Sequence, residues 1–369
     1  MDLNVRNWHV DLSGGRRAQL EVLESHAGTL AALPSASGSL GPLPAPLQGK
    51  KQLLVLFPGN PGVVHFYDQF VLQLARRTPG LVVLVMGFVG HAIGKAPVPS
   101  SGRHLTMSGS LFPREIDGTS DDDVFVLQDQ LEAADDFLRR LVFNAPDATK
   151  PPPLIAEAGF EVSVAGHSIG SYVAMHMAVR FPSIKTALLL TPTIMEMADT
   201  PNGRQNHWGL APLSVWAISS LVVPALGCLP AGAQRAVVNL AEPRMTAPHR
   251  RIVGAMNQPR IVRNVLTLAR SEFRQLGKLD VAMLRRLGAR AVCYCTHGDG
   301  WVPLRHVGEI HAACPAVAVH VEHDRHVKHA WCCYNAEAVA AWCAARLRGD
   351  PVASPSDPLA DAKPHRDSH

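Results

Sequence analysis

The sequence predicts an α/β protein with a doubly wound, mostly parallel sheet and a helical cap inserted into it. Three observations support this prediction. Short apolar runs of strand length alternate with segments of helical periodicity along most of the 369 residues. One of these runs leads straight into a glycine-flanked turn and a helix rich in small residues. Residues 195–288 interrupt the alternation and contain no convincing strand, which is typical of an insertion.

Composition limits the classes of protein that the chain can belong to. At 369 residues it has room for one large α/β domain with insertions or for two modest ones, and 47% apolar against 18% charged residues is ample for a core. The net charge of +4 is small and scattered, so no nucleic-acid partner is expected. Seven cysteines, with Cys332 and Cys333 adjacent, do not form a disulfide framework. A reducing compartment is therefore predicted.

The chain shows no membrane-targeting pattern of the usual kinds. Residues 1–10 lack the apolar core of a signal peptide, and no segment of transmembrane length is free of proline and glycine. We expect the chain to begin in the cytosol and to meet a membrane only through a surface element.

The core elements follow one another in a regular order. Residues 1–50 predict leading strands and a flexible loop rich in Pro, Gly and Ser, whereas residues 51–194 and 289–349 carry the α/β core. The cap at residues 195–288 is expected over the carboxyl edge of the sheet, where open α/β sheets bind ligands. The tail at 350–369 is predicted to be disordered. Within the core, buried strands are predicted at 52–57, 81–86, 160–165, 186–191, 289–296 and 316–321, and helices at 124–141, 171–180 and 330–342.

The turn at residues 166–170 (GHSIG) is the most informative motif. An apolar strand precedes it and a helix follows, which is the context that a G-x-S-x-G nucleophile elbow requires. The turn is so sharp that side chains two residues on either side of the serine would collide with backbone, and Gly166 and Gly170 remove that collision. Ser168 is therefore the candidate nucleophile of an α/β-hydrolase.

A serine needs a base and a group that orients the base, and α/β-hydrolases supply them in the order Ser, Asp or Glu, His. Asp299 follows an apolar strand in a glycine-rich loop and is the candidate acid. Four histidines spaced by three, from His320 to His329, begin in the last strand and continue into the loop after it. His329, at the start of the final helix, is the first choice for the base and His326 the second, whereas His320 lies inside the strand and is read as structural. No paired carboxylate or Cys pattern accompanies the histidines, so no metal or cofactor is expected.

An oxyanion hole needs two backbone N–H donors. One comes from the residue after the nucleophile, which is Ile169. The other comes from the loop after an early strand, here residues 57–62 (FPGNPG). Pro58 and Pro61 have no N–H, so Asn60 is the predicted second donor.

Together these motifs resemble the lipid droplet-associated hydrolase family of serine hydrolases. The resemblance spans about residues 50–345 and is carried by residues 57–62 with the following Phe-Tyr pair, residues 166–171, residues 193–194 leading to 200–203, and His329-Ala330. It implies an α/β-hydrolase fold, a triad at Ser168, Asp299 and His329, residence on lipid droplets, and activity on ester lipids, sterol esters among them. Two positions depart from the family pattern, since Gly300 and Trp331 stand where the family has Pro and Phe.

An uncharged stretch within the cap is the candidate lipid-contacting element. No Asp, Glu, Lys or Arg occurs between Arg204 and Arg235. Its three prolines argue against a membrane span, and a span would also separate the triad residues across a bilayer. The two remaining alternatives are a buried cap core and a helical hairpin that dips into one leaflet. The resemblance favours the hairpin, with Trp208, Trp216, Leu221 and Val222 as lipid-facing candidates.

The predicted function is that of a lipid esterase at the cytosolic side of the lipid droplet surface, with the endoplasmic reticulum as a second location. The expected partners are a lipid ester substrate and a droplet monolayer or membrane surface. The same triad would serve an acyltransferase or a thioesterase. A droplet-coating protein with little catalytic activity is the alternative outside enzymes, and its sign would be a lost triad member or a blocked oxyanion loop.

Overall fold

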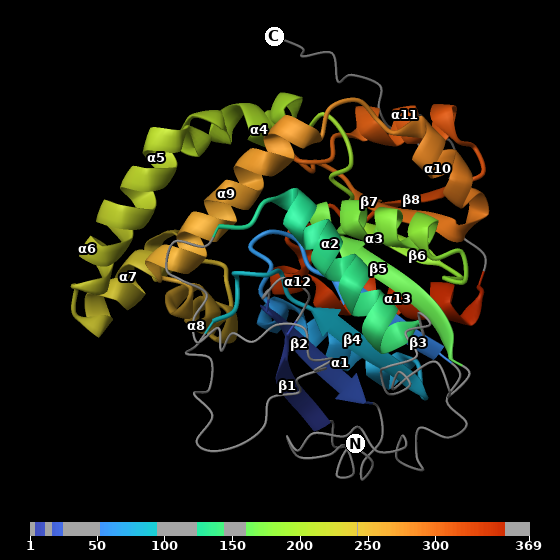
Figure 1. Cartoon of the computed structure of the whole chain (residues 1–369), viewed down its shortest axis with the longest axis horizontal. Helices are drawn as coiled ribbons and strands as arrows, with labels where there is room; N and C mark the ends of the chain where they lie inside the picture. The colour runs from blue at the N-terminus through green and yellow to red at the C-terminus, as the bar shows by residue number, and fades with distance from the viewer. Residues whose placement is uncertain are drawn as a thin grey trace, which may run out of the picture.

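The computed structural model describes residues 4–11, 17–24, 52–93, 124–143, 160–241 and 243–350. Its centre is an eight-stranded sheet in the order β1-β2-β4-β3-β5-β6-β7-β8 (Figure 1). The six strands from β4 to β8 are parallel, and only β1 and β2 are antiparallel to their neighbours. The predicted mostly parallel sheet is thereby confirmed. The strands are β1 (Asn4–Asp11), β2 (Arg17–Glu24), β3 (Gln52–Phe57), β4 (Leu81–Met86), β5 (Glu161–His167), β6 (Ala187–Leu190), β7 (Ala291–Thr296) and β8 (Ala318–Glu322).

Helices cover both faces of the sheet, which explains why the central strands read as unbroken apolar runs. Along β3, Leu53 and Val55 pack into one core cluster and Leu54 and Leu56 into the other. The first cluster includes residues of α2 (Leu127–Phe137), α3 (Ile169–Arg180), α10 (Val281–Leu287) and α11 (Leu304–Ala313). The second includes residues of α1 (Asp68–Arg77), α12 (Trp331–Tyr334) and α13 (Ala336–Arg348).

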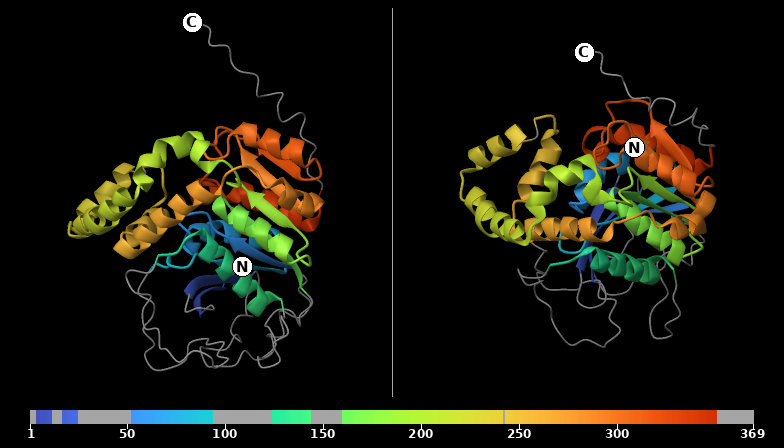
Figure 2. Two further views of the ribbon diagram at one scale, coloured as in Figure 1. Left: turned by 45° about the horizontal axis from the view of Figure 1, so that its top comes forward. Right: turned by 90° about the horizontal axis from the view of Figure 1, so that it is seen from above.

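In the range predicted for the cap, residues 195–288, the described residues form helices joined by turns and loops. The helices from α4 to α9 extend to one side of the sheet (Figures 1 and 2), whereas α10 packs in the core. Prolines divide its apolar stretch into short helices, because proline is accepted in the first turn of a helix but not in its interior. The cap helices are α4 (Pro201–Asn206), η8 (His207–Leu210), α5 (Pro212–Ala217), η9 (Ile218–Val222), α6 (Val223–Gly227), α7 (Ala231–Ala241), α8 (Ala247–Ala255) and α9 (Pro259–Gln275).

Among the described residues, no single helix is long and apolar enough to cross a membrane. One pair, Pro201–Leu210 with Pro212–Gly227, has the required length and composition together but is bent by 69° at its break.

The end of the core differs from the prediction in one respect. The single helix expected over 330–342 is broken at Asn335 into α12 and α13. The Asn335 side chain accepts a hydrogen bond from the Lys328 N–H at 3.3 Å and so joins the break to the loop that carries His329. The predicted flexible loop before β3, and the predicted tail beyond Asp350, lie outside the described residues.

Candidate active site

Ser168 occupies a sharp strand-to-helix turn between β5 and α3. Its backbone has φ 54° and ψ −122°, a conformation that residues other than glycine rarely adopt. A Cβ at Gly166 would overlap the Gly170 carbonyl, and a Cβ at Gly170 would overlap the Phe57 carbonyl. Both glycines are therefore needed for close approach of backbone, as the motif predicted.

The strand register gathers four loops at one edge of the sheet. Phe57 of β3 pairs with Gly166 of β5, so the loop after β3 runs beside Ser168. The Ser168 N–H donates to the Leu190 carbonyl of β6 at 2.9 Å, and β6 pairs in turn with β7. Because the carboxyl ends of parallel strands meet at the same edge, residues far apart in the sequence meet here.

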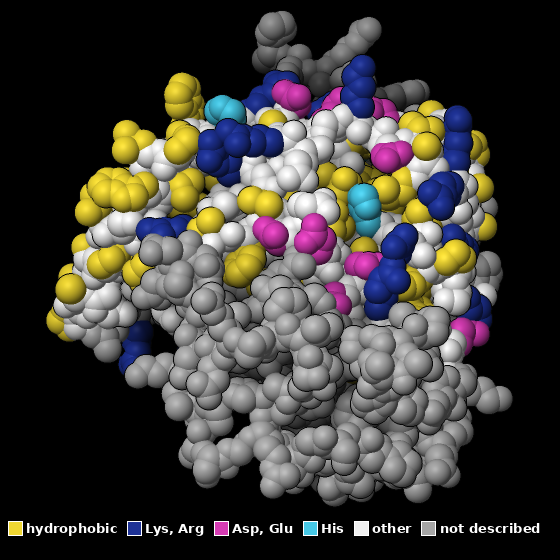
Figure 3. Space-filling model, in the orientation of Figure 1, with side chains coloured by type: hydrophobic (Ala, Val, Ile, Leu, Met, Phe, Trp, Pro, Cys, Tyr) yellow, Lys and Arg dark blue, Asp and Glu magenta, His cyan; other side chains and the backbone are white. Residues whose placement is uncertain are grey.

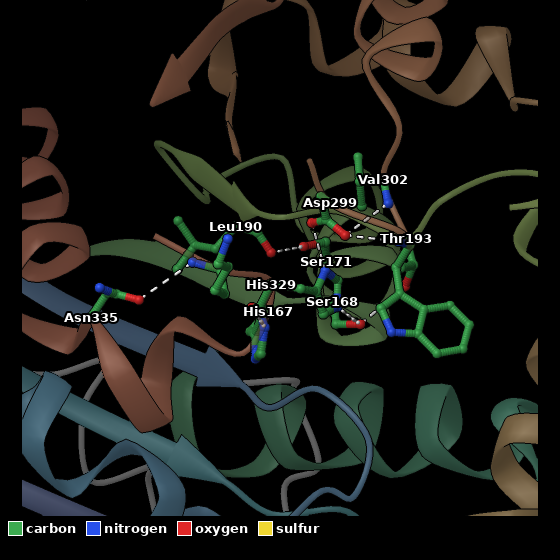
Figure 4. Close-up of polar contacts among 11 residues, drawn as sticks. His167, Ser168, Ser171, Leu190, Thr193, Asp299, Val302, His329 and Asn335 are labelled. Carbon is green, nitrogen blue, oxygen red and sulfur yellow. Dashed lines mark hydrogen bonds and ion pairs between the residues drawn. The ribbon is translucent and has the colours of Figure 1, made fainter. Parts of the chain in front are cut away.

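Three of the predicted residues form a continuous hydrogen-bonded chain (Figure 4). His329 Nε2 lies 2.9 Å from Ser168 Oγ, and His329 Nδ1 lies 2.7 Å from Asp299 Oδ2. The Asp299 side chain is fully buried, whereas the His329 side chain is 17% exposed. The geometry matches that of a nucleophile, a base and a carboxylate that orients the base.

The carboxylate of Asp299 is held by both of its oxygens. Burial alone would raise its pKa, but the His329 imidazole and two backbone N–H donors outweigh burial, so the pKa lies below its ordinary value. Those donors are Trp301 and Val302, whose N–H groups reach Asp299 Oδ1 at 2.8 and 3.1 Å. Asp299 Oδ2 is thereby left to face His329 in the ionised form.

Of the two predicted oxyanion donors, Ile169 directly follows Ser168, and Asn60 follows Gly59, which packs against Ser168. Within the described part of the chain, the backbone N–H groups of Asn60 and Ile169 have no hydrogen-bond acceptor. The neighbouring glycines are not free in this way, since Gly59 donates to Tyr67 Oη at 2.7 Å and Gly62 donates to the Gly59 carbonyl at 2.6 Å. The N–H groups of Asn60 and Ile169 are therefore free of an intramolecular acceptor among the described residues.

The structure also distinguishes among the histidines considered for the base. His326 is exposed in the turn after β8, and its backbone N–H donates to Asp324 Oδ1 at 2.8 Å. His320 lies within β8 and stacks on Tyr294, with a distance of 5.4 Å between the ring centroids. His329 is the histidine that reaches Ser168.

A surface depression of about 580 Å³ adjoins Asp299 and His329. Pro201 and Asn202 of the cap line it together with residues 298–301 and 328–330. This volume falls within the range of small-molecule sites. The junction of cap and core is thus open beside the hydrogen-bonded chain.

The structure adds four residues to the site to which the sequence analysis assigned no role there. Thr193 Oγ1 lies 3.4 Å from Ser168 Oγ, and Glu272 of α9 contacts the Asn60 side chain. His167 and Tyr67 hydrogen bond to each other at 2.6 Å behind Ser168. In the sequence, Tyr67, His167 and Thr193 stand in motifs that carry the family resemblance, whereas no pattern marks Glu272.

The four lipid-facing candidates all have exposed side chains. They lie in η8, α5 and η9. In Figure 3, exposed apolar side chains gather over this side of the cap. The exposed large hydrophobic residues of the cap are Trp208 (81%), Leu213 (74%), Trp216 (52%), Leu221 (56%), Val222 (48%), Leu229 (38%), Val237 (43%) and Leu240 (85%). We call this set the apolar arm. Such a surface is unusual for a protein that contacts only water.

Comparison with known proteins agrees with this architecture. The profile of the family described as lipid-droplet associated hydrolase matches residues 50–332. The lipid droplet-associated hydrolase of Gallus gallus is 26% identical over 306 residues, covering 81% of this chain and 85% of the relative. That of Rattus norvegicus is 25% identical over 296 residues, covering 80% and 84%.

Solved structures agree on the fold. The haloalkane dehalogenase DbeA from Bradyrhizobium elkani superposes with a TM-score of 0.57 at 12% identity, covering 95% of this chain and 99% of that one. This likeness supports the α/β-hydrolase fold. The family profile covers well over half of the chain, and the curated relatives match most of its length. The chain therefore belongs to the lipid-droplet associated hydrolase family.

Proposed function

We propose that the protein is a serine esterase that cleaves carboxylic esters of lipids, sterol esters among them, through an acyl-enzyme. The observation that supports this most directly is the chain from Ser168 through His329 to Asp299, with contacts of 2.9 and 2.7 Å. Among the described residues, the backbone N–H groups of Asn60 and Ile169 have no acceptor and are available to an oxyanion. The family adds an association with lipid droplets.

The proposed mechanism assigns one step to each group. Ser168 Oγ attacks the ester carbonyl while His329 Nε2 takes its proton, and Asp299 stabilises the imidazolium that forms. The N–H groups of Ile169 and Asn60 donate to the oxyanion. The imidazolium then protonates the leaving alcohol, which departs and leaves an ester on Ser168. His329 Nε2 then takes a proton from water, which attacks the acyl carbonyl; the carboxylic acid departs, and the imidazolium returns the proton to Ser168 Oγ.

A fluorophosphonate probe, which phosphonylates activated serines, tests this proposal. Wild-type protein should be labelled, Ser168→Ala should show no labelling, and His329→Ala should be labelled at least 100-fold more slowly because the general base is lost. Folding of each variant is checked by circular dichroism. A folded wild type that takes no label would overturn the esterase proposal, as would labelling that persists in Ser168→Ala.

The apolar arm supports a second part of the proposal, that the protein docks on the phospholipid monolayer of a lipid droplet or on the endoplasmic reticulum membrane. Trp208 and Trp216 suit the membrane interface, because an amphipathic ring there contacts apolar acyl chains on one side and polar head groups on the other. No Asp, Glu, Lys or Arg stands between Arg204 and Arg235, so insertion of this stretch buries no carboxylate, ammonium or guanidinium group. The cap thus brings the junction beside His329 close to a lipid phase.

Removing apolar area from the arm should weaken lipid binding. Replacing Trp208, Trp216, Leu221 and Val222 together with serine is expected to lower co-flotation with phosphatidylcholine-coated triolein droplets by at least tenfold, since each side chain contributes about 1 kcal/mol or more when buried in lipid. Val124→Ser with Tyr334→Ser is the matched control, because these exposed residues, 44% and 38% accessible, lie outside the cap. Equal flotation of the quadruple variant and wild type would contradict docking through the arm.

A further inference from the structure

A second buried hydrogen-bond chain runs behind the candidate triad. The Gly59 N–H reaches Tyr67 Oη at 2.7 Å, and Tyr67 Oη lies 2.6 Å from His167 Nδ1. His167 Nε2 lies 2.9 Å from the backbone carbonyl oxygen of His329. The chain therefore starts in the oxyanion loop, passes the residue next to the nucleophile, and ends on the residue that carries the base.

The chemistry of its two ends fixes the direction of every hydrogen bond. A carbonyl oxygen only accepts, so His167 Nε2 must carry a proton and donate it to His329. A neutral imidazole then has an unprotonated Nδ1, which accepts from the Tyr67 hydroxyl. The oxygen of that hydroxyl remains free to accept from the Gly59 N–H. Each donor in the chain thus meets an acceptor.

Burial keeps both side chains in the form that this direction requires. Tyr67 and His167 are 2% and 5% exposed. Burial, followed by the nearby His329, lowers the pKa of His167 to about 3, so the ring stays neutral at physiological pH. Burial raises the pKa of Tyr67, so its hydroxyl stays protonated. The fully buried Trp331 packs against both rings, with centroid distances of 5.9 Å to Tyr67 and 4.8 Å to His167.

The proposed reaction requires the oxyanion loop and His329 to be held at fixed positions relative to Ser168. Gly59 precedes the oxyanion donor Asn60 and packs so closely on Ser168 that a Cβ on Gly59 would lie 2.9 Å from Ser168 Cβ. His329 lies in the loop after β8, whereas the oxyanion loop follows β3. The hydrogen bonds that join Ser168, His329 and Asp299 do not involve the oxyanion loop. The hydrogen bonds of Tyr67 and His167 connect that loop to the backbone of His329.

We propose that Tyr67 and His167 are positioning residues, which hold the oxyanion loop and the backbone of His329 at a fixed separation across Ser168. The proposal rests on the serine esterase function above. His167 acts through its neighbours and transfers no proton, because both of its ring nitrogens are engaged away from Ser168. Their removal should therefore slow the chemical step rather than weaken substrate binding.

Tyr67→Phe tests the proposal because it keeps the ring against Trp331 and removes only the hydroxyl. We expect kcat for p-nitrophenyl butyrate to fall about 10- to 100-fold, with KM within about twofold of wild type, since the loss of buried hydrogen bonds displaces groups used in the transition state. Tyr294→Phe is the matched control. It also removes a tyrosine hydroxyl from inside the fold, one that donates to Glu322 at 2.7 Å, and it should lower thermal stability without this fall in kcat.

A second measurement does not depend on turnover. The low-field proton NMR signal of His329 Nδ1–H, which reports its bond to Asp299, should shift or broaden in Tyr67→Phe and not in Tyr294→Phe. An unchanged kcat and an unchanged signal in folded Tyr67→Phe would overturn the positioning role. A wild type with no esterase activity would instead defeat the proposed function, while the NMR signal would still decide whether Tyr67 positions His329.

Discussion

Asp299→Asn is expected to lower kcat for ester hydrolysis about 10⁴-fold while KM changes little, a loss of the size that follows when a serine hydrolase cannot hold its base in the correct tautomer. Asp299 Oδ1 already accepts the N–H groups of Trp301 and Val302. In the variant the amide oxygen is held at that position, and the amide NH₂ is left to face His329. His329 Nδ1 must then accept, which moves the ring proton to Nε2, where it faces Ser168 Oγ and blocks proton transfer from it.

Steady-state kinetics and the rate of fluorophosphonate labelling measure this effect. Asp280→Asn is the matched control, because Asp280 also caps a backbone N–H, that of Met283 at 2.8 Å, but at the start of α10. Its kcat should stay close to that of wild type. A kcat for Asp299→Asn within tenfold of wild type would show that Asp299 does not orient the base.

The sequence was informative wherever local chemistry dictates the structure. The elbow needs glycine at 166 and 170 on steric grounds, so the turn and its serine could be predicted without any knowledge of the fold. Strands that are buried on both faces read as apolar runs, because successive side chains enter opposite cores. Leu53 and Leu54 are an example, since each packs into a different core cluster. Chain order and position after a strand then selected Asp299, and position before the last helices selected His329.

The sequence could not show contacts that depend on how distant segments pack. Tyr67 and His167 lie 100 residues apart, and Asn60 and Glu272 lie 212 apart. Neither pair has a local pattern, because each is created when a loop or the cap settles on the sheet. The break at Asn335 has the same origin, since apolar periodicity continues through it and the interruption comes with a hydrogen bond to the His329 loop.

Glu272 is where we expect the second large effect, on stability rather than on catalysis. It lies on α9, is 1% exposed, and accepts a hydrogen bond from Asn60 Nδ2 at 3.2 Å through Oε1. Its Oε2 has no partner among the described residues. Burial raises the pKa of this carboxyl from 4.5 to about 8, although the hydrogen bond from Asn60 opposes the shift. The folded protein therefore keeps a proton at neutral pH that the unfolded chain has lost.

The sign of the pH dependence follows from this difference. Between pH 4.5 and about 8 the unfolded state binds fewer protons at Glu272 than the folded state, so the free energy of unfolding falls as the pH rises. The contribution of Glu272 to the free energy of unfolding is fully present below pH 4.5. Above that pH it falls by about 1.4 kcal/mol per pH unit, a loss of roughly 3 kcal/mol by pH 7. Glutamine cannot ionise, so Glu272→Gln should match wild type near pH 4.5 and exceed it by about this amount at pH 7.

Urea unfolding at pH 5 and pH 7 measures the gap. Glu309→Gln on α11, where the side chain is 47% exposed, makes the same chemical change without burial and should show little gap at either pH. A Glu272→Gln variant that is less stable than wild type at pH 7, or a gap that does not grow with pH, would show that the carboxyl is ionised in the folded protein. A neutral Glu272 also fits the proposed chemistry, because a fixed negative charge bonded to Asn60 would oppose the oxyanion that the Asn60 N–H is proposed to bind.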